Sequence, residues 1–448
     1  GECAAMEARA EADLAAEEAQ AGGFAARLRE RWPMQKRIAV AVGLLLLLAL
    51  VAVASLGLYR LLFEGPVDER PSVIFMISDG FGPAAATFAR TMRRNQTALE
   101  LDEMLVGTAR TYSSSSLITD SAAGATAYSC ALKTYNGAIA VDDALLPCAT
   151  SMEAAKAQGW RTGFVVKSRV THATPAAWSA HVPDRNLEED IAFQQTFNQS
   201  LDLFMGGGLD EFTLRADGLD LLDELTARGY RTLLDKEELS LPDLKLPVVG
   251  LFAESHLLFE VDRVYQENKV QPTLAEMTQA ALGLLGGDGE PFFLMIEGSM
   301  IDLAAHNHDA YAEYLEIVSY NEAVAVVKDY VAAHPNTIVI STSDHSTGGI
   351  TLGRGYGNGT YPDPYEWRPD VLYQQTASAE YIAAQLQPNL ANANATIFEY
   401  TGIHIDDEDY LRLEGAMANS DSRFLKIAVG DIVAKAALIG WGTPRPTG

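Results

Sequence analysis

SVIFMISDG, at residues 72–80, is a short apolar run that leads directly into an acidic residue and a glycine. Apolar runs of about four to eight residues, bounded by turn residues, are typical of strands buried on both faces of a parallel sheet. Similar runs recur along the chain as GFVVKS at 163–168, PFFLMIE at 291–297 and TIVISTS at 337–343. We therefore expect buried strands at all of these positions.

Helical patterns separate these runs, at residues 152–158, 274–285 and 311–333. Alternation of strands and helices predicts an α/β fold of three layers, doubly wound around a mainly parallel sheet. The chain of 448 residues is long enough for one large domain or two ordinary ones. It can bury a large core without help from a metal or a disulfide.

The N-terminal region has a different composition. Residues 1–37 are rich in Ala, Glu and Arg and predict a polar tail, whereas residues 38–59 carry no charge and are long enough to cross a bilayer as one helix. A cleaved signal peptide ending near Ala54 is the competing interpretation, but its apolar region would be too long and too far from the N-terminus. Basic residues precede the apolar run, which predicts a cytosolic tail, a transmembrane signal anchor and a lumenal domain at 60–448: Arg27, Arg29, Arg31, Lys36 and Arg37.

The charge balance excludes one large class of partners. The chain has 33 basic and 60 acidic residues, a formal net charge of −27. Nucleic acids are bound by clustered Lys and Arg, so we expect no nucleic-acid partner. A phosphate-binding site in this chain needs a local source of positive potential, namely metal ions, an arginine or a helix N-terminus.

The cysteines and sequons bear on the compartment. Cys3 precedes the apolar run, while Cys130 and Cys148 follow it, and no spacing typical of a structural zinc site is present. In an oxidising lumen Cys130 and Cys148 could form a disulfide, with free thiols as the alternative. Four glycosylation sequons fit the same compartment: they begin at Asn95, Asn198, Asn358 and Asn394.

Three of the expected strands lead into a carboxylate. Asp79 follows the first run, Glu297 ends the third and Asp344 follows the last. A single acid carries little information, since Asp79 with its glycine could be only a turn. Ligand sites of doubly wound sheets lie beyond the carboxyl ends of the strands, so we expect the three carboxylates to converge there.

Histidines accompany two of these acids. The segment EGSMIDLAAHNHD at 297–309 adds Asp302 and His306, whose i, i+4 spacing places both side chains on one face of a helix. The segment SDHSTGG at 343–349 adds His345. A single histidine is more often structural than a ligand, but the set together predicts a metal centre. Mixed carboxylate and imidazole ligands suit Zn²⁺, and an all-oxygen set suits Mg²⁺.

TDSAAGATA at 119–127 supplies a candidate nucleophile. Small residues follow Ser121, so its hydroxyl can lie uncrowded at the start of an Ala-rich helix, where the helix N-terminus favours an alkoxide or a bound phosphate. A nearby Zn²⁺ can lower the pKa of the hydroxyl without a histidine base. The alternative is a cluster of Thr, Asp and Ser that only caps the helix.

These motifs, taken together, resemble the successive signature blocks of the alkaline phosphatases. The strings are SDGFGPA, TDSAAGATA, HATPAAWSAH, IEGSMIDLAAH and STSDHSTGG, in the order that the family has them. The membrane anchor and three further strings resemble the vacuolar, repressible alkaline phosphatases of fungi in particular: TYNGAIAV, MGGGLDEF and GLFAESHLLFEVDR.

The resemblance implies a role for each matching residue. Ser121 corresponds to the serine that is transiently phosphorylated, and Arg185, in HVPDR, to the arginine that holds the phosphate oxygens. The implied ligands are Asp302 and His306 for the first zinc; Asp79, Asp344 and His345 for the second zinc; and Asp79, Thr174 and Glu297 for magnesium, with His172 close to the magnesium.

The resemblance also implies an activity and a location. We expect hydrolysis of small phosphomonoesters with two Zn²⁺ and one Mg²⁺, through a phosphoserine on Ser121. We expect one helix in the membrane, a cytosolic N-terminus, a lumenal catalytic domain, a vacuolar location and a family-like homodimer.

One departure from the family concerns the first zinc. Its third ligand in the family is a histidine in a block near WTTHGHSA, whereas this chain reads ALIGWGTPRPTG at 437–448, as if truncated. His308 is a hypothetical substitute, His404 lies in a segment that resembles a non-ligating region, and Leu303 replaces a polar residue, which could change phosphate affinity. A catalytically silent membrane glycoprotein is therefore the alternative. A phosphodiesterase or sulfatase ranks last, because those relatives lack the complete TDSAAGATA block with HATP and a downstream arginine.

Overall fold

The structure is a computed structural model that describes residues 42–43, 45–51, 70–94, 98–265, 270–354, 366–387 and 389–443. The chain divides into two units, Gly1–Asp68 and Glu69–Gly448. In the first unit, residues 42–43 and 45–51 are helical. Among the described residues no helix is long and apolar enough to cross a membrane. The predicted tail and most of the predicted anchor lie outside the described residues.

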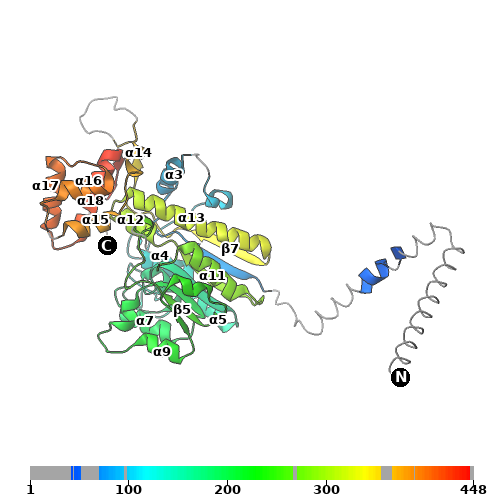
Figure 1. Ribbon diagram of the computed structural model, residues 1–448. Helices are drawn as coiled ribbons and strands as arrows, with labels where there is room; N and C mark the ends of the chain where they lie inside the picture. Colours follow the sequence, from blue (N-terminus) through cyan, green and yellow to red (C-terminus); the bar gives the residue numbers. More distant parts are fainter. Residues whose placement is uncertain are drawn as a thin grey trace, which may run out of the picture. The chain divides into compact units, whose positions relative to one another are not determined.

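The second unit is built on a parallel sheet in the order β4-β5-β3-β2-β6-β1-β7 (Figure 1). The four strands expected from the sequence are present as β1, β2, β6 and β7, and every pairing in this sheet is parallel. The strand bounds are β1 Ser72–Ile77, β2 Arg161–Arg169, β3 Leu203–Gly207, β4 Arg231–Leu233, β5 Val248–Leu251, β6 Phe292–Glu297 and β7 Thr337–Thr342.

Helices cover both faces of the sheet, which confirms the three-layer α/β fold. The apolar side chains of one face pack against α3, α11 and α13, and those of the other face against α5, α6, α7 and α9. The helix bounds are α3 Pro83–Met92, α4 Ser121–Cys130, α5 Ser151–Ala157, α6 Ala173–Ser179, α7 Glu188–Phe197, α8 Leu209–Thr213, α9 Leu221–Ala227, α10 Glu260–Tyr265, α11 Leu274–Gly286, α12 Met300–His306 and α13 Ala310–Ala333, with 3₁₀ turns at Glu100–Met104 and Lys236–Ser240.

Strand residues alternate between the two cores because successive side chains point to opposite faces. On β2, Val165 packs in the core beneath α11 and α13, while Phe164 and Val166 pack in the other. On the edge strand β7 the alternation leaves Ile338 and Ile340 nearly half exposed, at 48% and 45%. The central strands are buried on both faces, which explains their nearly continuous apolar sequences.

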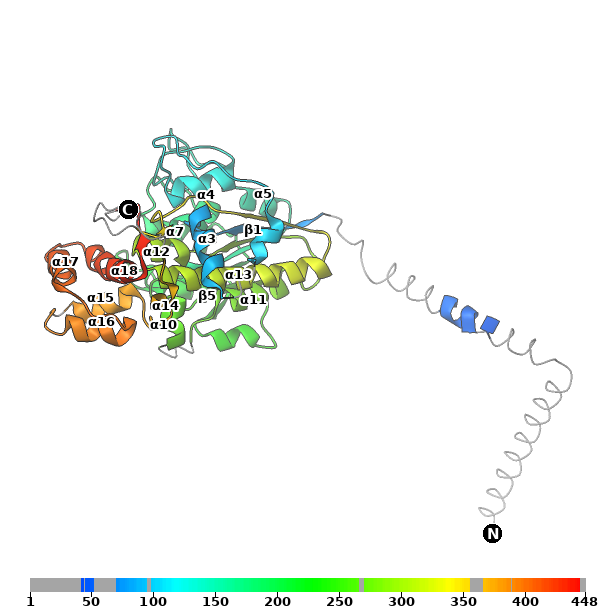
Figure 2. The same ribbon diagram turned by 90° about the horizontal axis from the view of Figure 1, so that it is seen from above.

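The C-terminal part forms a helical subdomain beside α12 and α13 (Figures 1 and 2). We define it as α14 to α18, and it has an apolar core of its own, which includes Ile382, Ile397 and Leu413. After it the chain returns and β9 pairs antiparallel with β8. The bounds are α14 Pro369–Leu372, α15 Ala379–Leu386, α16 Ala393–Thr401, α17 Asp407–Met417, α18 Arg423–Ala437, β8 Thr351–Leu352 and β9 Ile439–Gly440.

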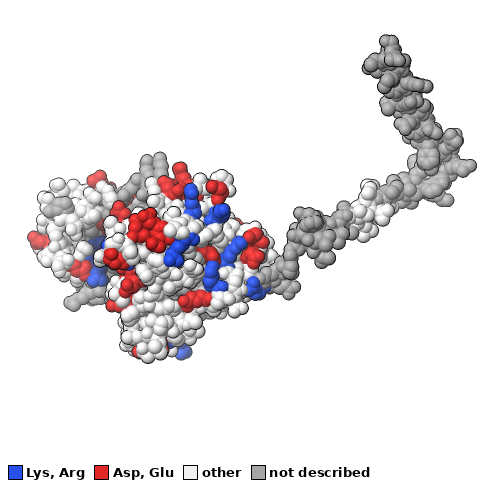
Figure 3. All heavy atoms as spheres, turned by 90° about the horizontal axis from the view of Figure 1, so that it is seen from below, with Lys and Arg blue, Asp and Glu red and all other residues white. Residues whose placement is uncertain are grey.

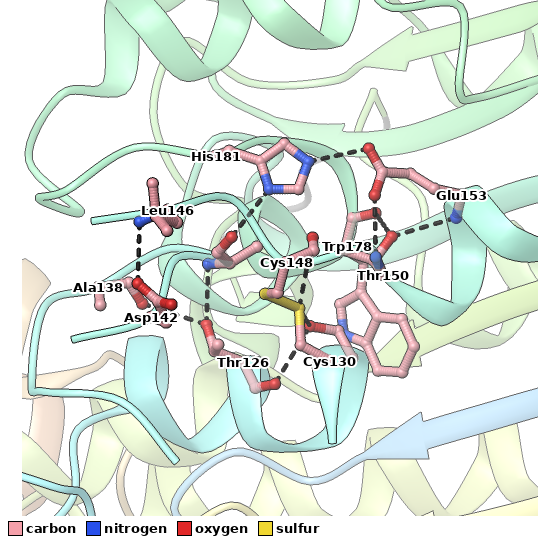
Figure 4. Close-up of a disulfide and its surroundings, with 12 residues drawn as sticks. Thr126, Cys130, Ala138, Asp142, Leu146, Cys148, Thr150, Glu153, Trp178 and His181 are labelled. Atoms are coloured by element: carbon pink, nitrogen blue, oxygen red, sulfur yellow. Dashed lines mark hydrogen bonds and ion pairs between the residues drawn. A yellow bond between two sulfur atoms is a disulfide. The ribbon is translucent and has the colours of Figure 1, made fainter. Parts of the chain in front are cut away.

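A disulfide joins Cys130, the last residue of α4, to Cys148, with 5.9 Å between the Cα atoms (Figure 4). The disulfide form of this pair is therefore the one present. Thr126 of the same helix donates a hydrogen bond to the carbonyl of Ala138, and His181 lies 2.9 Å from Glu153 nearby. The C-terminal end of α4 is thus held by covalent and polar contacts.

The surface of the second unit mixes charges of both signs. On the face in Figure 3, acidic and basic side chains form small groups among uncharged residues. Ion pairs among the described residues include Arg161 with Asp288 at 2.6 Å and Lys328 with Glu100 at 2.6 Å. Exposed pairs of this kind contribute little to stability.

Candidate active site

The carboxylates of Asp79, Glu297 and Asp344 lie at the carboxyl ends of three neighbouring strands, β1, β6 and β7. All three side chains are buried, with at most 1% of the residue exposed. Because these strands are parallel and adjacent, their ends meet at one edge of the sheet. The structure therefore brings together the acids that the sequence places at strand ends.

Helix α12 adds Asp302 and His306 to this edge. The two side chains lie on one face of the helix, with Nε2 of His306 at 3.3 Å from Oδ2 of Asp302. Gly80, after β1, has a φ of +71°, and a Cβ there would lie 2.8 Å from the Cα of Asp302. Only glycine fits this turn, which is why the first strand and α12 can approach so closely.

The loop after β7 supplies His345. Its Nε2 lies 3.3 Å from Oδ2 of Asp344 and 3.5 Å from Oδ1 of Asp79. Its Nδ1 lies 3.1 Å from the hydroxyl of Thr347, which donates a hydrogen bond to Oδ1 of Asp302 over 2.5 Å. Thr347 therefore joins two candidate ligands from distant parts of the chain. The sequence contained Thr347 within SDHSTGG, but nothing in the motif indicated this contact.

Ser121 is the first residue of α4, and its side chain faces the carboxylates. Its Oγ lies 3.1 Å from Nε2 of His345 and 3.4 Å from Oδ1 of Asp79. Asp120 is the N-cap, because its Oδ1 accepts a hydrogen bond from the backbone N–H of Ala123. The capping role thus belongs to Asp120, and it leaves the hydroxyl of Ser121 directed into the site.

Arg185 reaches the same place from the loop before α7. One guanidinium nitrogen donates to Oδ2 of Asp120 over 3.2 Å, and another lies 3.1 Å from Nε2 of His172. Its backbone N–H donates to the carbonyl of Gly137. The guanidinium is therefore fixed beside the N-terminus of α4, where an anion would find both the arginine and the helix end.

A second group of candidate ligands lies on the other side of Asp79. Ligand atoms of Asp79, His172 and Glu297 lie within 4.8 Å of one another, as do those of Asp79, Asp344 and His345. The hydroxyl of Thr174 lies 3.5 Å from Oδ2 of Asp79. Asp79 therefore belongs to both groups, and oxygen donors dominate the group that contains Glu297.

Two serines orient Glu297. The hydroxyls of Ser299 and Ser168 donate to Oε2 of Glu297 over 2.6 and 3.3 Å. Sequence reasoning did not predict either serine, although Ser299 stands two residues after Glu297 in EGSMID. Hydrogen bonds to a carboxylate of this kind fix which oxygen remains free for a ligand.

The electrostatics of the site favour bound cations. Burial and then the charges of Asp344, Asp302 and Glu297 raise the pKa of Asp79 far above its usual range. Burial is also the main cause that raises the pKa of Glu297 to about 7. Among the described residues, Glu297 Oε1 and Asp344 Oδ2 have no hydrogen-bond partner, although both are buried. Buried carboxylates with free oxygens fit metal ions, which would neutralise their charge.

The histidine pKa values differ between the two ends of the site. Burial, followed by the charges of Arg185 and His256, lowers the pKa of His172 well below its usual value. Burial also lowers the pKa of His306, but the charge and the hydrogen bond of Asp302 together outweigh this and raise it. A neutral His172 is in the protonation state that a ligand or a hydrogen-bond acceptor requires.

The histidine proposed as a substitute ligand is occupied elsewhere. His308 follows α12 and is buried, with Nδ1 at 2.8 Å from Oδ1 of Asp431 and Nε2 at 3.2 Å from the hydroxyl of Thr443. It belongs to neither group of candidate ligands among the described residues. His404 stacks on Phe398 in the helical subdomain. Leu303 packs at the edge of the main apolar core.

Comparison with known proteins shows the family to which the chain belongs. A sequence model of the alkaline phosphatase family matches residues 71–396. The alkaline phosphatase of Schizosaccharomyces pombe is 41% identical, over 90% of this chain and 80% of its own length. The repressible alkaline phosphatase of Saccharomyces cerevisiae is 35% identical, over 93% and 80%.

Solved structures of the same family share the fold. Thermus thermophilus alkaline phosphatase superposes with a TM-score of 0.75 and 30% identity, covering 86% of this chain and 87% of that one. A mutant alkaline phosphatase of the Antarctic bacterium TAB5, with Mg bound in its M3 site, superposes with a TM-score of 0.58 and 34% identity, over 66% and 85%. The chain belongs to the alkaline phosphatase family, whose members are phosphoric monoester hydrolases.

Proposed function

We propose that this chain hydrolyses phosphate monoesters by passing the phosphoryl group first to Ser121 and then to water. The observation that carries the proposal is the position of the Ser121 hydroxyl, 3.1 Å from His345 and 3.4 Å from Asp79 at the N-terminus of α4. A hydroxyl beside buried acids and imidazole, at a helix end that favours anions, is placed to act as a nucleophile.

The residues present fit the metals that the family resemblance implies. Asp302 and His306 would hold a first zinc, Asp79, Asp344 and His345 a second, and Asp79, Thr174 and Glu297 a magnesium ion with His172 beside it. When bound, these ions supply positive charge that lowers the pKa of the Ser121 hydroxyl and stabilises the leaving oxygen.

The protein's own groups bind and orient the substrate. Arg185 presents two guanidinium nitrogens to the phosphate oxygens, and Asp120 holds that guanidinium in place. Oγ of Ser121 forms a bond to phosphorus while the ester P–O bond breaks, and the leaving alkoxide takes a proton from water. Attack by water on phosphoserine then forms a new P–O bond, breaks the bond to Oγ, and releases inorganic phosphate.

A catalytically silent membrane glycoprotein remains the second candidate. One observation favours it: among the described residues only Asp302 and His306 correspond to ligands of the first zinc. His308 does not join them, because its side chain contacts Asp431. The presence of Ser121, of Arg185 and of all the residues that correspond to ligands of the second zinc argues against it. Metal content separates the candidates, because the silent protein would not hold zinc beside Asp302.

The test is hydrolysis of a chromogenic phosphomonoester by purified residues 65–448, with Zn²⁺ and Mg²⁺ added. We expect activity that is lost in Ser121→Ala, lost on chelation and restored by Zn²⁺ with Mg²⁺. A phosphodiester substrate runs in parallel and should be cleaved far more slowly. Folded protein that binds zinc and hydrolyses neither ester contradicts the proposal. Folded protein without zinc supports the silent alternative.

We also propose that residues 38–59 anchor the chain in an endomembrane, with the catalytic domain in the lumen of the vacuole and the enzyme as a homodimer. The sequence supports the anchor through its apolar run and the basic residues before it. Asn198 and Asn394 are exposed, as glycosylation in a lumen requires. Protease protection of the second unit in sealed vesicles, with an endoglycosidase-sensitive shift in mass, tests the topology. Digestion of the catalytic domain in intact vesicles contradicts it.

A further inference from the structure

The turn between α12 and α13, residues 307–309, lies against the helical subdomain and the segment that follows it. This turn directly follows His306, the last residue of α12. Figures 1 and 2 both show α12 beside α18. The three turn residues together contact α18, the N-terminus of α15 and the chain that follows α18.

The backbone of Asn307 lies against the backbone of α18 at Gly430. A Cβ added at Gly430 would lie 2.3 Å from the carbonyl oxygen of Asn307 and 2.7 Å from that of His308. Any side chain at Gly430 would therefore push the turn away from α18, since these neighbours are backbone atoms and cannot rotate aside. The glycine permits a contact between helix and turn that no other residue would allow.

His308 is held on three sides. Its Nδ1 donates to Oδ1 of Asp431 over 2.8 Å, and its Nε2 lies 3.2 Å from the hydroxyl oxygen of Thr443. Its ring stacks on Trp441, with centroids 4.9 Å apart and 5° between the planes. His308 has a φ of +54°, a backbone conformation that a non-glycine residue keeps only when its surroundings impose it.

Asp309 completes the arrangement. Its carboxylate accepts hydrogen bonds from the backbone N–H of Ala379 over 2.6 Å and from the amide of Gln375 over 2.9 Å. It also caps α13 through the N–H of Ala312. The N-terminus of α15 is thereby tied to the junction of α12 and α13.

We propose that the helical subdomain positions the metal-binding helix α12, with Gly430 and Asp431 as positioning residues for His306. This rests on the proposed function, because it assigns Asp302 and His306 to the first zinc. Helix α12 is short, so the direction of both side chains depends on where its C-terminal turn is held. The helix α18 that holds it lies beyond residues 71–396, which match the alkaline phosphatase family.

The test compares Gly430→Ala with Gly415→Ala in the full chain. Gly415 lies in α17 of the same subdomain and has nothing within 4 Å of an added Cβ, so it is the matched control. Zinc affinity is measured by chelator competition, and hydrogen exchange is measured over residues 300–309. We expect Gly430→Ala to weaken zinc binding about 10-fold or more and to speed exchange, as loss of outer-shell support does. Gly415→Ala should change neither.

If Gly430→Ala does not fold, a second pair of variants tests the same proposal. Asp431→Ala removes the acceptor for His308 and should also weaken zinc binding, whereas Asp431→Asn keeps an acceptor oxygen and should restore much of the affinity. Folded variants with the zinc affinity and exchange rates of the parent chain overturn the proposal. If the parent chain itself binds no zinc, the proposed function fails, and exchange alone then decides whether the subdomain holds α12.

Discussion

The hydroxyl of Thr347 donates a hydrogen bond to Oδ1 of Asp302 over 2.5 Å. It also lies 3.1 Å from Nδ1 of His345, so one small side chain fixes a carboxylate and an imidazole from separate elements. We predict that Thr347→Val, which keeps the shape but removes the hydroxyl, lowers phosphatase activity and zinc affinity by about 10- to 100-fold. Thr347→Ser should recover most of both. Equal activity of the Val and Ser variants would mean that the hydroxyl does not position the ligands.

Arg185 should contribute to substrate binding through its planar fork. Arg185→Lys keeps the charge but loses the paired contacts, and we expect kcat/KM to fall about 10- to 100-fold, the value of one or two hydrogen bonds to a charged group. The exposed Arg231, on β4, is the matched control, and Arg231→Lys should have the activity of the parent chain. Steady-state kinetics on one phosphomonoester measure both. Unchanged kcat/KM in Arg185→Lys would remove Arg185 from the phosphate site.

The disulfide should contribute to stability more than to catalysis. It closes a loop with a sequence separation of 18 residues, and chain entropy then predicts a contribution of about 3 kcal/mol. We expect Cys130→Ala/Cys148→Ala to lower the free energy of unfolding by that order, measured by denaturant titration. Activity at 25 °C should remain within about threefold, because Ser121 lies at the other end of α4. A loss of activity without a loss of stability would contradict this assignment.

The pair of His181 and Glu153 should make stability depend on pH. Burial lowers the pKa of His181, but the hydrogen bond and charge of Glu153 outweigh this and raise it above 6.5. Burial raises the pKa of Glu153, but the hydrogen bonds to His181 and Thr150 and the charge of His181 together outweigh this and lower it below 4.5. The His181 contribution is complete below 6.5 and is lost as pH rises through the raised pKa. The Glu153 contribution is complete above 4.5 and is lost as pH falls through the lowered one.

The pair of His181 and Glu153 therefore adds most to the free energy of unfolding between pH 4.5 and pH 6.5. Glu153→Gln removes the charge and keeps an oxygen for the helix cap at Thr150. We expect the difference in free energy of unfolding between Glu153→Gln and the parent chain to be larger at about pH 5.5 than at about pH 8. A difference that does not change between those two pH values would show that the charge pair adds no stability.

Lys167 is a buried cation whose removal should destabilise the fold. Its ammonium group donates to Glu260 over 2.7 Å and to Glu316 over 2.8 Å, and its side chain is 1% exposed. Lys167→Met leaves both carboxylates without that cation and should cost about 3–5 kcal/mol in the free energy of unfolding. The double variant Lys167→Met/Glu316→Gln should recover at least about 1 kcal/mol, because Glu260 keeps its contact with Arg263. No recovery would mean that repulsion between the carboxylates is not the cause.

The sequence predicted the parts of the fold that carry strong local patterns. The strands with continuous apolar runs, β1, β2, β6 and β7, are where they were expected, and so are α5, α11 and α13. Strands β3, β4 and β5 were not predicted. The apolar part of Leu203–Gly207 is short because the strand ends in two glycines, and Arg231–Leu233 is too short for a periodic signal. The helical subdomain was not predicted either. Its sequence carries no motif, and its apolar residues form a core only when the helices pack against one another.

In the candidate site, too, the residues that stand in motifs were predicted and those outside a recognised motif role were not. Residues in motifs, such as Asp79, Asp302 and His345, converge as the strand ends and the helix spacing imply. The residues that support them did not stand out: Thr347 and Ser299 are ordinary hydroxyls whose partners lie 45 and 2 residues away. The contact of Thr347 with Asp302 depends on a neighbour that is distant in the sequence, which no local pattern reveals.

The most direct test of the mechanism is to look for the phosphoserine itself. The purified chain, supplied with Zn²⁺ and Mg²⁺, is mixed with a phosphomonoester, quenched in acid during turnover, digested and analysed by mass spectrometry. We predict phosphate on the peptide that contains Ser121, and none in the Ser121→Ala variant treated in the same way. Hydrolysis of the ester at full rate with no phosphate on Ser121, or with phosphate on another residue, would contradict the account.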